Sequence, residues 1–161
     1  MSLASVTIFN GMSGDNLNRL TNGATFLETR DGTTIFEQGD PADAVFSVVA
    51  GDGQVRVGVV DHRSKALMVE VFRTGEIYGE IGVIDGGSRT ASAVVRGNVR
   101  LAKIRAAAFL DALSHSPELG DALLIIAAIG EMLKIRLPGD ETELVQILLQ
   151  IIDLGIANSD P

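Results

Sequence analysis

The 161-residue sequence contains no cysteine, no tryptophan and only two histidines. Without thiols the chain cannot form disulfides, thiolate zinc sites or cysteine-ligated iron–sulfur clusters. A β-barrel oxidase or isomerase needs several histidines and a carboxylate around one metal ion. His62 and His115 stand far apart in the sequence, and we expect both to be solvated. The chain is therefore predicted to be a non-enzymatic protein without a metal.

Positive charge is also scarce, with 13 Lys and Arg against 21 Asp and Glu and a net charge of −8. A nucleic-acid surface needs clustered basic residues, so we predict no nucleic-acid partner, although a local pocket could still hold one small phosphate. The longest apolar run, residues 122–130, is far shorter than the roughly 18–20 residues of a membrane span. No secretion signal opens the chain. We expect a cytoplasmic protein without a membrane partner.

Short strands separated by glycine-containing turns dominate residues 24–104. The segments 44–50, 54–60 and 66–72 are typical strands, and turns follow every eight to twelve residues. This spacing indicates an antiparallel sandwich, roll or barrel. A short helix is predicted before it, over residues 13–22, capped by Ser13 or Asp15. The fold class is therefore mainly β with flanking helices, an α+β arrangement.

Helical periodicity replaces the strand pattern over residues 105–137. One helix is expected to bury Phe109, Leu110 and Leu113 on a common side, and Ser116 with Pro117 predicts the start of the next. A further helix is expected within residues 138–161, because Asp140 is followed three residues later by a glutamate, as in a capping box.

These C-terminal helices carry few polar side chains. Residues 122–129 contain none, so most sides of the helix must be covered by protein. Packing against the β-structure and against each other would be sufficient. We favour a homo-oligomer interface, with a dimer as the first expectation. The segment 138–161 lacks Lys and Arg, which is atypical of a DNA-reading element, and its regular composition is compatible with a natural or an engineered interface.

The segment "YGEIGVIDGGSRTASAVV", residues 78–95, carries the clearest chemistry. An arginine side chain and the amide groups at a helix start both bind phosphate, and glycine lets the backbone approach a ligand. Arg89 supplies the cation, and a short helix beginning near Gly79 would supply the amides. Glu80 repels phosphate, but its carboxylate can accept a hydrogen bond from a sugar hydroxyl or hold Arg89 in a structural ion pair. A ribose phosphate suits this combination.

This segment resembles the phosphate-binding cassette of cyclic nucleotide-binding domains, which occur in catabolite-activator-type regulators, protein kinase A regulatory subunits and cyclic nucleotide-gated channels. The family pattern is Phe-Gly-Glu followed by Arg-(Ala/Thr)-Ala-(Ser/Thr). The chain has Tyr78-Gly79-Glu80 and, nine residues after Glu80, Arg89-Thr90-Ala91-Ser92. A second resemblance, over residues 31–51, covers the first hairpin of the family. The family resemblance as a whole covers roughly residues 8–137.

The resemblance implies the fold, the ligand and the roles of the site residues. The fold would be an antiparallel double-stranded β-helix, a jelly-roll-like β-roll over residues 24–104, within a domain of residues 1–137. The ligand would be cAMP or cGMP. Glu80 would accept from the ribose 2′-hydroxyl and Arg89 would pair with the cyclic phosphate. The backbone amides of Gly79, Ile81, Gly82, Thr90 and Ala91 would complete the phosphate site, with Val69 and Val71 as the sugar and base wall.

Two points stay open in the sequence. The hydroxyl of Thr90 could reach the amino group of a guanine base, but members with Arg-Thr-Ala also favour cAMP. Gly82 stands where alanine is common, which suggests a more mobile loop. We predict a regulatory sensor whose ligand binding is coupled to the C-terminal helices. The alternative is a homo-oligomerisation module with a vestigial pocket.

Overall fold

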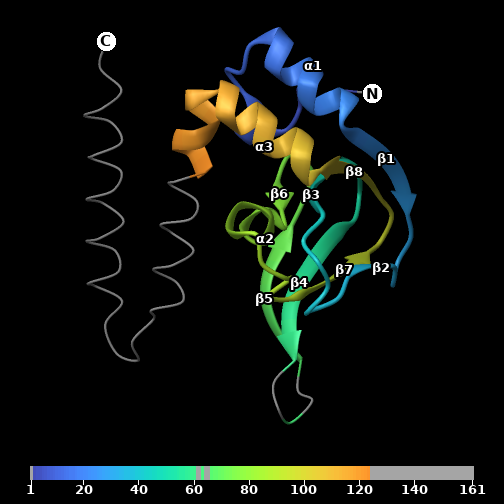
Figure 1. The fold of residues 1–161 in the computed structure, drawn as a ribbon. Coiled ribbons are helices and arrows are strands. Elements are labelled where there is room, and N and C mark those ends of the chain that lie inside the picture. Colours follow the sequence, from blue (N-terminus) through green and yellow to red (C-terminus); the bar gives the residue numbers. More distant parts are fainter. Residues whose placement is uncertain (1, 61–62, 64–65, 124–161) are drawn as a thin grey trace, which may run out of the picture. The chain divides into compact units, whose positions relative to one another are not determined.

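The computed structural model describes residues 2–60, 63 and 66–123, and Figure 1 shows how their helices and strands are arranged. A short 3-10 helix, η1 (Thr7–Phe9), and helix α1 (Gly14–Asn22) come first, and helix α3 (Ala106–His115) follows the strands. Helix α2 (Glu80–Asp85) lies between the sixth and seventh strands. The strands of this described part are β1 (Ala24–Thr29), β2 (Thr34–Phe36), β3 (Ala44–Gly51), β4 (Gln54–Val60), β5 (Ala66–Phe72), β6 (Ile77–Tyr78), β7 (Ser92–Arg96) and β8 (Val99–Arg105).

The strands form two four-stranded antiparallel sheets, with orders β1-β8-β3-β6 and β2-β7-β4-β5. Strand β8 lies between β1 and β3, so Ile104 is paired with Ala24 on one side and with Val45 on the other. Strand β7 lies in the same way between β2 and β4. Distant parts of the sequence are therefore neighbours in both sheets. The predicted mainly β fold with an antiparallel β-roll is confirmed.

The interior of the roll is apolar and draws on both sheets. Phe36 of β2, Phe46 of β3, Tyr78 of β6, Val95 of β7 and Leu101 of β8 belong to one buried cluster. Alternate residues of a strand point to opposite faces, which places one side of each strand in this cluster. The cluster fixes the positions of β3 and β6, the two strands that precede and support the candidate site.

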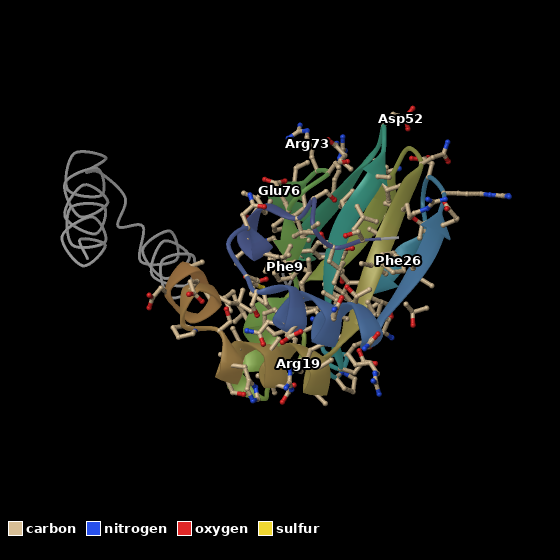
Figure 2. The ribbon with its side chains drawn as sticks, turned by 90° about the horizontal axis from the view of Figure 1, so that it is seen from above. Phe9, Arg19, Phe26, Asp52, Arg73 and Glu76 are labelled. Atoms are coloured by element: carbon tan, nitrogen blue, oxygen red, sulfur yellow. The ribbon has the colours of Figure 1, made fainter. Side chains whose placement is uncertain are left out.

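Helices α1 and α3 pack together at one end of the roll (Figure 1). The hydroxyl of Ser13 accepts a hydrogen bond from the amide of Asn16 at 3.2 Å, which confirms the predicted cap of α1. A Cβ at Gly23 would lie 2.2 Å from that of Ala108, so glycine permits the close approach of the two segments. Arg19 of α1 lies at this end in Figure 2, and the turn that contains Asp52 lies at the opposite end.

The predicted apolar side of α3 is partly wrong. Phe109 and Ala112 are fully buried, whereas Leu110 is 41% exposed. Because Ala108 lies against Gly23, the helix is turned so that positions 109 and 112 face the protein. The helical periodicity was compatible with either rotation, and the tight contact at Gly23 selects one of them.

The chain after α3 is described only to residue 123. Residues 117–123 are helical, and the Ser116 hydroxyl accepts from the amide of Leu119 at 3.4 Å, which confirms the predicted helix start. Residues 1–119 and 120–161 form separate compact units. The remaining predicted helices, the boundary at 137/138, the proposed interface helix 138–161 and His62 lie outside the described residues. Within the described part, no helix combines the length and the apolar character needed to cross a membrane.

Candidate functional site

The candidate site is the segment from Tyr78 to Ser92, which we call the cassette. It leaves β6, forms helix α2 beside β3, and returns to the start of β7 (Figure 1). Gly79 precedes α2 in the left-handed conformation, with φ of 79° and ψ of 11°, and Gly86 follows it with φ of 71°. A residue with a Cβ rarely adopts this conformation, so glycine at both ends makes the sharp entry and exit possible. The predicted short helix is confirmed.

Gly82 has a packing role. It is buried within α2, and a Cβ at this position would lie 2.7 Å from the Cβ of Ala42. Val83 is also buried, while Ile81 and Ile84 are 37% and 45% exposed. The glycine therefore brings α2 against the loop before β3. This close contact argues against the interpretation of Gly82 as a sign of loop mobility.

The backbone around Arg89 is held by the loop that follows β2. The amide of Arg89 donates to the carbonyl oxygen of Asp40 at 2.8 Å, and the amide of Gly39 donates to the carbonyl oxygen of Arg89 at 2.8 Å. Pro41 and Ser88 form an isolated antiparallel bridge beside them. The residues of the first-hairpin resemblance thus position the arginine of the cassette, although they lie far from it in sequence.

Arg89 is buried, with only 4% of the residue exposed. Nη1 donates to the carbonyl oxygen of Gly79 at 2.7 Å, and Nη2 donates to that of Ala44 at 2.5 Å. The Cζ atom lies 4.2 Å from the centroid of the Phe36 ring, in range of a cation–π interaction. Burial lowers the pKa of Arg89, an effect that nearby Asp43 opposes. The guanidinium retains its charge because arginine titrates far above neutral pH.

Asp43 is a functional candidate that the sequence interpretation missed. One carboxylate oxygen lies 3.9 Å from Nη2 of Arg89, and the other lies 3.4 Å from Nζ of Lys103. Asp43 lies within residues 31–51, the first-hairpin resemblance, for which the sequence implied no ligand role. Asp40 does act as a turn residue, since its carboxylate accepts from the amide of Glu37 at 2.9 Å.

Glu80 lies at the start of α2 and is partly buried. Burial raises the pKa of its carboxyl group, and the neighbouring Glu70 raises it further, whereas Arg89 and a backbone hydrogen bond lower it. Within the described residues the ion pair of Arg89 is with Asp43, and Glu80 forms none with it. The two side chains belong to one electrostatic site without direct contact. The structural ion-pair alternative is therefore not supported.

The remaining predicted amides belong to the two ends of the cassette. Ile81 and Gly82 are in the first turn of α2, where amide groups have no partner within the helix. Thr90 is exposed and Ala91 is partly buried, directly before β7. One group of amides therefore directly follows Glu80, and the other directly follows Arg89.

The predicted wall of Val69 and Val71 does not agree with the strand register. Phe72 is paired with the buried Val55, and Glu70 is paired with Val57, whereas Val71 is paired with the exposed Arg56. Paired residues share a face, so Phe72 lies on the side of β5 that faces the interior cluster and Val71 lies on the other side. The side chain of Val69 lies outside the described residues. The contact of Val69 and Val71 with the ligand stays a prediction.

Among the described residues, no three histidine or acidic side chains converge closely enough to hold a metal ion. The site instead combines a buried cation, a partly buried carboxylate and the amides of a helix start. Arginine forms strong hydrogen bonds with phosphate, and a carboxylate accepts from hydroxyl groups. The arrangement is suited to a small ligand that carries both groups.

Comparisons with known proteins show the family of the chain. The model of the cyclic nucleotide-binding domain family matches residues 11–116. The chain is 25% identical, over 126 residues, to the CRP-like cAMP-activated global transcriptional regulator of Mycobacterium tuberculosis, covering 78% of this chain and 55% of the regulator. It is 30% identical over 73 residues to the cAMP-dependent protein kinase regulatory subunit of Aspergillus niger, covering 45% of this chain and 16% of that subunit.

Solved structures show the same fold. The catabolite activator protein of Thermus thermophilus matches with a TM-score of 0.67 and 24% identity, over 89% of this chain and 63% of that one. The regulatory domain of Toxoplasma gondii PKA, crystallised with cAMP, matches with a TM-score of 0.68 and 22% identity, over 78% of this chain and 47% of that one. The chain thus spans about half the length of the mycobacterial regulator and less of the fungal subunit.

Proposed function

The chain belongs to the cyclic nucleotide-binding domain family, and we propose that it is a regulatory sensor that binds cAMP or cGMP in the cassette. Arg89 pairs with the cyclic phosphate, and Glu80 accepts a hydrogen bond from the ribose 2′-hydroxyl. The amides of Gly79, Ile81, Gly82, Thr90 and Ala91 complete the phosphate site. Phe72 replaces Val71 as the candidate for the apolar wall.

One observation supports this function most strongly. Arg89 is only 4% exposed. Its guanidinium nevertheless donates to two neutral carbonyl oxygens, and the carboxylate nearest to it, that of Asp43, is 3.9 Å away and 66% exposed. A buried charge without a close counter-ion is costly to the fold. An anionic ligand that reaches Arg89 would supply that counter-ion. The start of α2 adds amide groups that also favour an anion.

The choice of base is a finer question. The names of the matched regulator and regulatory subunit contain cAMP, which favours cAMP as the first ligand to test. Thr90 is exposed within the cassette, so its hydroxyl is available to the amino group of a guanine base. Both nucleotides therefore belong in the same experiment.

Coupling to the rest of the chain is the second part of the proposal. A ligand shifts an equilibrium between arrangements only through its different affinity for them. The exposed Ile81 and Ile84 give α2 an apolar side next to the binding residues. We expect ligand binding to favour one arrangement of the C-terminal helices and to change the assembly of a homo-oligomer, a dimer being the first expectation. The predicted absence of a nucleic-acid partner stays a prediction.

Calorimetric titration of the whole chain with cAMP and cGMP tests the proposal. Arg89→Ala is the diagnostic variant, and Arg100→Ala is its matched control, because Arg100 forms an exposed ion pair with Glu28 away from the cassette. We expect binding by the wild type and by Arg100→Ala, with a loss of at least about hundredfold for Arg89→Ala, as expected when a charged hydrogen-bond partner is removed.

Failure to bind either nucleotide would refute the sensor function and favour the alternative, an oligomerisation module with an unused pocket. Light scattering with and without nucleotide then separates the two. A sensor changes its assembly or hydrodynamic radius on binding, whereas a passive module has the same assembly in both conditions.

A further inference from the structure

Two buried side-chain atoms in the described part of the chain have no hydrogen-bond partner, the hydroxyl oxygen of Tyr78 and Nε of Arg89. Buried polar groups in folded proteins are nearly always paired, and unpaired ones tend to occur where a ligand or a second conformation completes them. Both atoms belong to the cassette, at its first residue and at its phosphate-binding arginine.

The two side chains share the same aromatic surroundings. The Tyr78 ring is stacked on Phe46, with centroids 5.6 Å apart and planes at 19°, and its centroid lies 6.1 Å from that of Phe36. The guanidinium carbon of Arg89 lies 4.2 Å from the Phe36 centroid and 5.6 Å from the Phe46 centroid. Tyr78 and Arg89 thus contact the same two rings, and Nη1 of Arg89 is bonded to Gly79, the residue after Tyr78.

The chemistry of the two groups is complementary. A neutral phenol oxygen can accept a hydrogen bond, and Nε–H of arginine can only donate one. Burial raises the pKa of Tyr78, so the hydroxyl remains neutral under ordinary conditions. In the structure, Nη1 and Nη2 of Arg89 donate hydrogen bonds to the backbone carbonyl oxygens of Gly79 and Ala44. A phosphate that draws these two nitrogens toward itself must shift the guanidinium, and the shift changes the position of Nε among the aromatic rings.

We propose that Tyr78 is a positioning residue for the phosphate-binding arginine, whose Nε–H donates to the Tyr78 hydroxyl once a cyclic nucleotide engages Nη1 and Nη2. The inference rests on the proposed function and adds a residue to it. Phenylalanine, the usual residue of the family pattern, has no hydroxyl to offer at this position. The chain would therefore hold its arginine by a contact that the common pattern does not provide.

Tyr78→Phe in the whole chain separates this role from a purely structural one. The ligand-free variant is expected to melt at a higher temperature, because it no longer buries an unpaired hydroxyl. Its affinity for the nucleotide bound by the wild type is expected to fall about tenfold, the typical worth of a hydrogen bond to a charged group. Stability and affinity therefore change in opposite directions.

Ser47→Ala is the matched control. The Ser47 hydroxyl is also fully buried, but it donates to the carbonyl oxygen of Glu76 at 2.9 Å. Its removal is expected to lower the melting temperature without changing the affinity. The Arg89 Nε–H signal in a proton–nitrogen NMR spectrum, assigned by its loss in Arg89→Lys, gives a direct measurement. It is expected to shift on nucleotide addition in the wild type and to shift much less in Tyr78→Phe.

Wild-type affinity in Tyr78→Phe would overturn the inference and leave the proposed function intact. A loss of affinity that accompanies a loss of stability, with an unchanged Arg89 signal, would also overturn it, because the hydroxyl would then act only on the fold. A wild-type chain that binds neither nucleotide would overturn the proposed function and this inference together.

Discussion

The two halves of the cassette are built differently. One half contains Arg89, which is held by many contacts. Its backbone forms hydrogen bonds with Gly39 and Asp40, its guanidinium donates two more, and the ring of Phe36 lies against it. Around Glu80, the short helix α2 lacks a side-chain cap and is entered and left through left-handed glycines. The backbone of the half that we assign to the phosphate is therefore held by several contacts, and the half that we assign to the sugar is connected through left-handed glycines.

This difference indicates a division of tasks. A backbone held in place at Arg89 favours affinity, because only the guanidinium has to reorient on binding. Helix α2 exposes the apolar residues Ile81 and Ile84, so it is the element that we expect to respond when the sugar engages Glu80. Affinity would then depend mainly on the Arg89 half, and the response of the protein mainly on α2.

The largest loss of stability and affinity is expected for Gly79→Ala, because Gly79 precedes α2 and also accepts a hydrogen bond from Arg89. An alanine there adds left-handed strain and places its Cβ 2.6 Å from Nη1 of Arg89. We expect a loss of about 3 kcal/mol or more in the free energy of unfolding, from strain and steric overlap together, and a large loss of nucleotide affinity. Denaturant unfolding and calorimetry measure the two quantities.

Gly32→Ala is the control for Gly79→Ala. Gly32 has φ of 83°, but a Cβ at this position meets nothing within 4 Å. Strain alone should cost about 1–2 kcal/mol and leave the affinity unchanged. Equal losses in both variants would contradict the proposed contact between Gly79 and the arginine.

A smaller effect, confined to the α2 half, is expected for Gly82→Ala. The added Cβ would lie 2.7 Å from that of Ala42 and push α2 outward. We expect a loss of about 1–3 kcal/mol in stability, together with weaker discrimination between cAMP and 2′-deoxy-cAMP. Gly14→Ala, at the open first residue of α1, should be neutral or slightly stabilising. Unchanged discrimination in Gly82→Ala would argue against coupling between this contact and Glu80.

The pH dependence of the two halves should also differ. Burial raises the pKa of Glu80 above its ordinary value of 4.5, so this residue favours the folded state below that value and its contribution is lost as the pH rises through the raised pKa. A ribose hydroxyl donates to the ionised form, so the affinity should rise with pH over the same interval. Titrations between pH 4.5 and 7 should show this rise in the wild type and not in Glu80→Gln.

Glu80→Gln should in addition be more stable than the wild type at neutral pH, because it buries no charge. Glu70 has a raised pKa as well, owing first to burial and then to Glu76, so part of the pH dependence of stability should persist in the variant. A pH-independent affinity in the wild type would contradict the assignment of Glu80 to the sugar.

The smallest effect is expected for Asp43→Asn. Its carboxylate lies 3.9 Å from Arg89 and is 66% exposed, so solvent screens the interaction. The stability should change by no more than about 1 kcal/mol, with a correspondingly modest change in affinity. A loss as large as that of Arg89→Ala would show that the ion pair, rather than the backbone carbonyl oxygens, holds the guanidinium.

Several of these features could be predicted from the sequence, and others could not. The turn residues and the spacing of apolar segments predicted β4 and β5 with the bounds that the structure has. The family resemblance located Glu80 and Arg89 on one segment. The sequence left the inward face of β5 undecided, because both faces of that strand carry apolar residues and only the pairing of Phe72 with Val55 decides between them.

The contacts of Arg89 could not be predicted from the sequence either. Ala44 binds the guanidinium through its carbonyl oxygen, and a backbone atom leaves no sequence signal. Gly82 resembled a flexible loop residue, but its role depends on Ala42, which lies far away in sequence. Tyr78 appeared to be a mild replacement of phenylalanine, and its unpaired hydroxyl became apparent only in the buried aromatic cluster.

The most direct test compares cAMP with 2′-deoxy-cAMP in the wild type, Glu80→Gln and Arg89→Ala by calorimetry, or cGMP with its 2′-deoxy form if cGMP binds better. We expect Glu80→Gln to weaken binding of the ribose nucleotide by about tenfold or more and to leave the deoxy form nearly unchanged, whereas Arg89→Ala weakens both alike. If Glu80→Gln weakened both forms equally, or Arg89→Ala weakened neither, the division of phosphate and sugar between these two residues would be wrong.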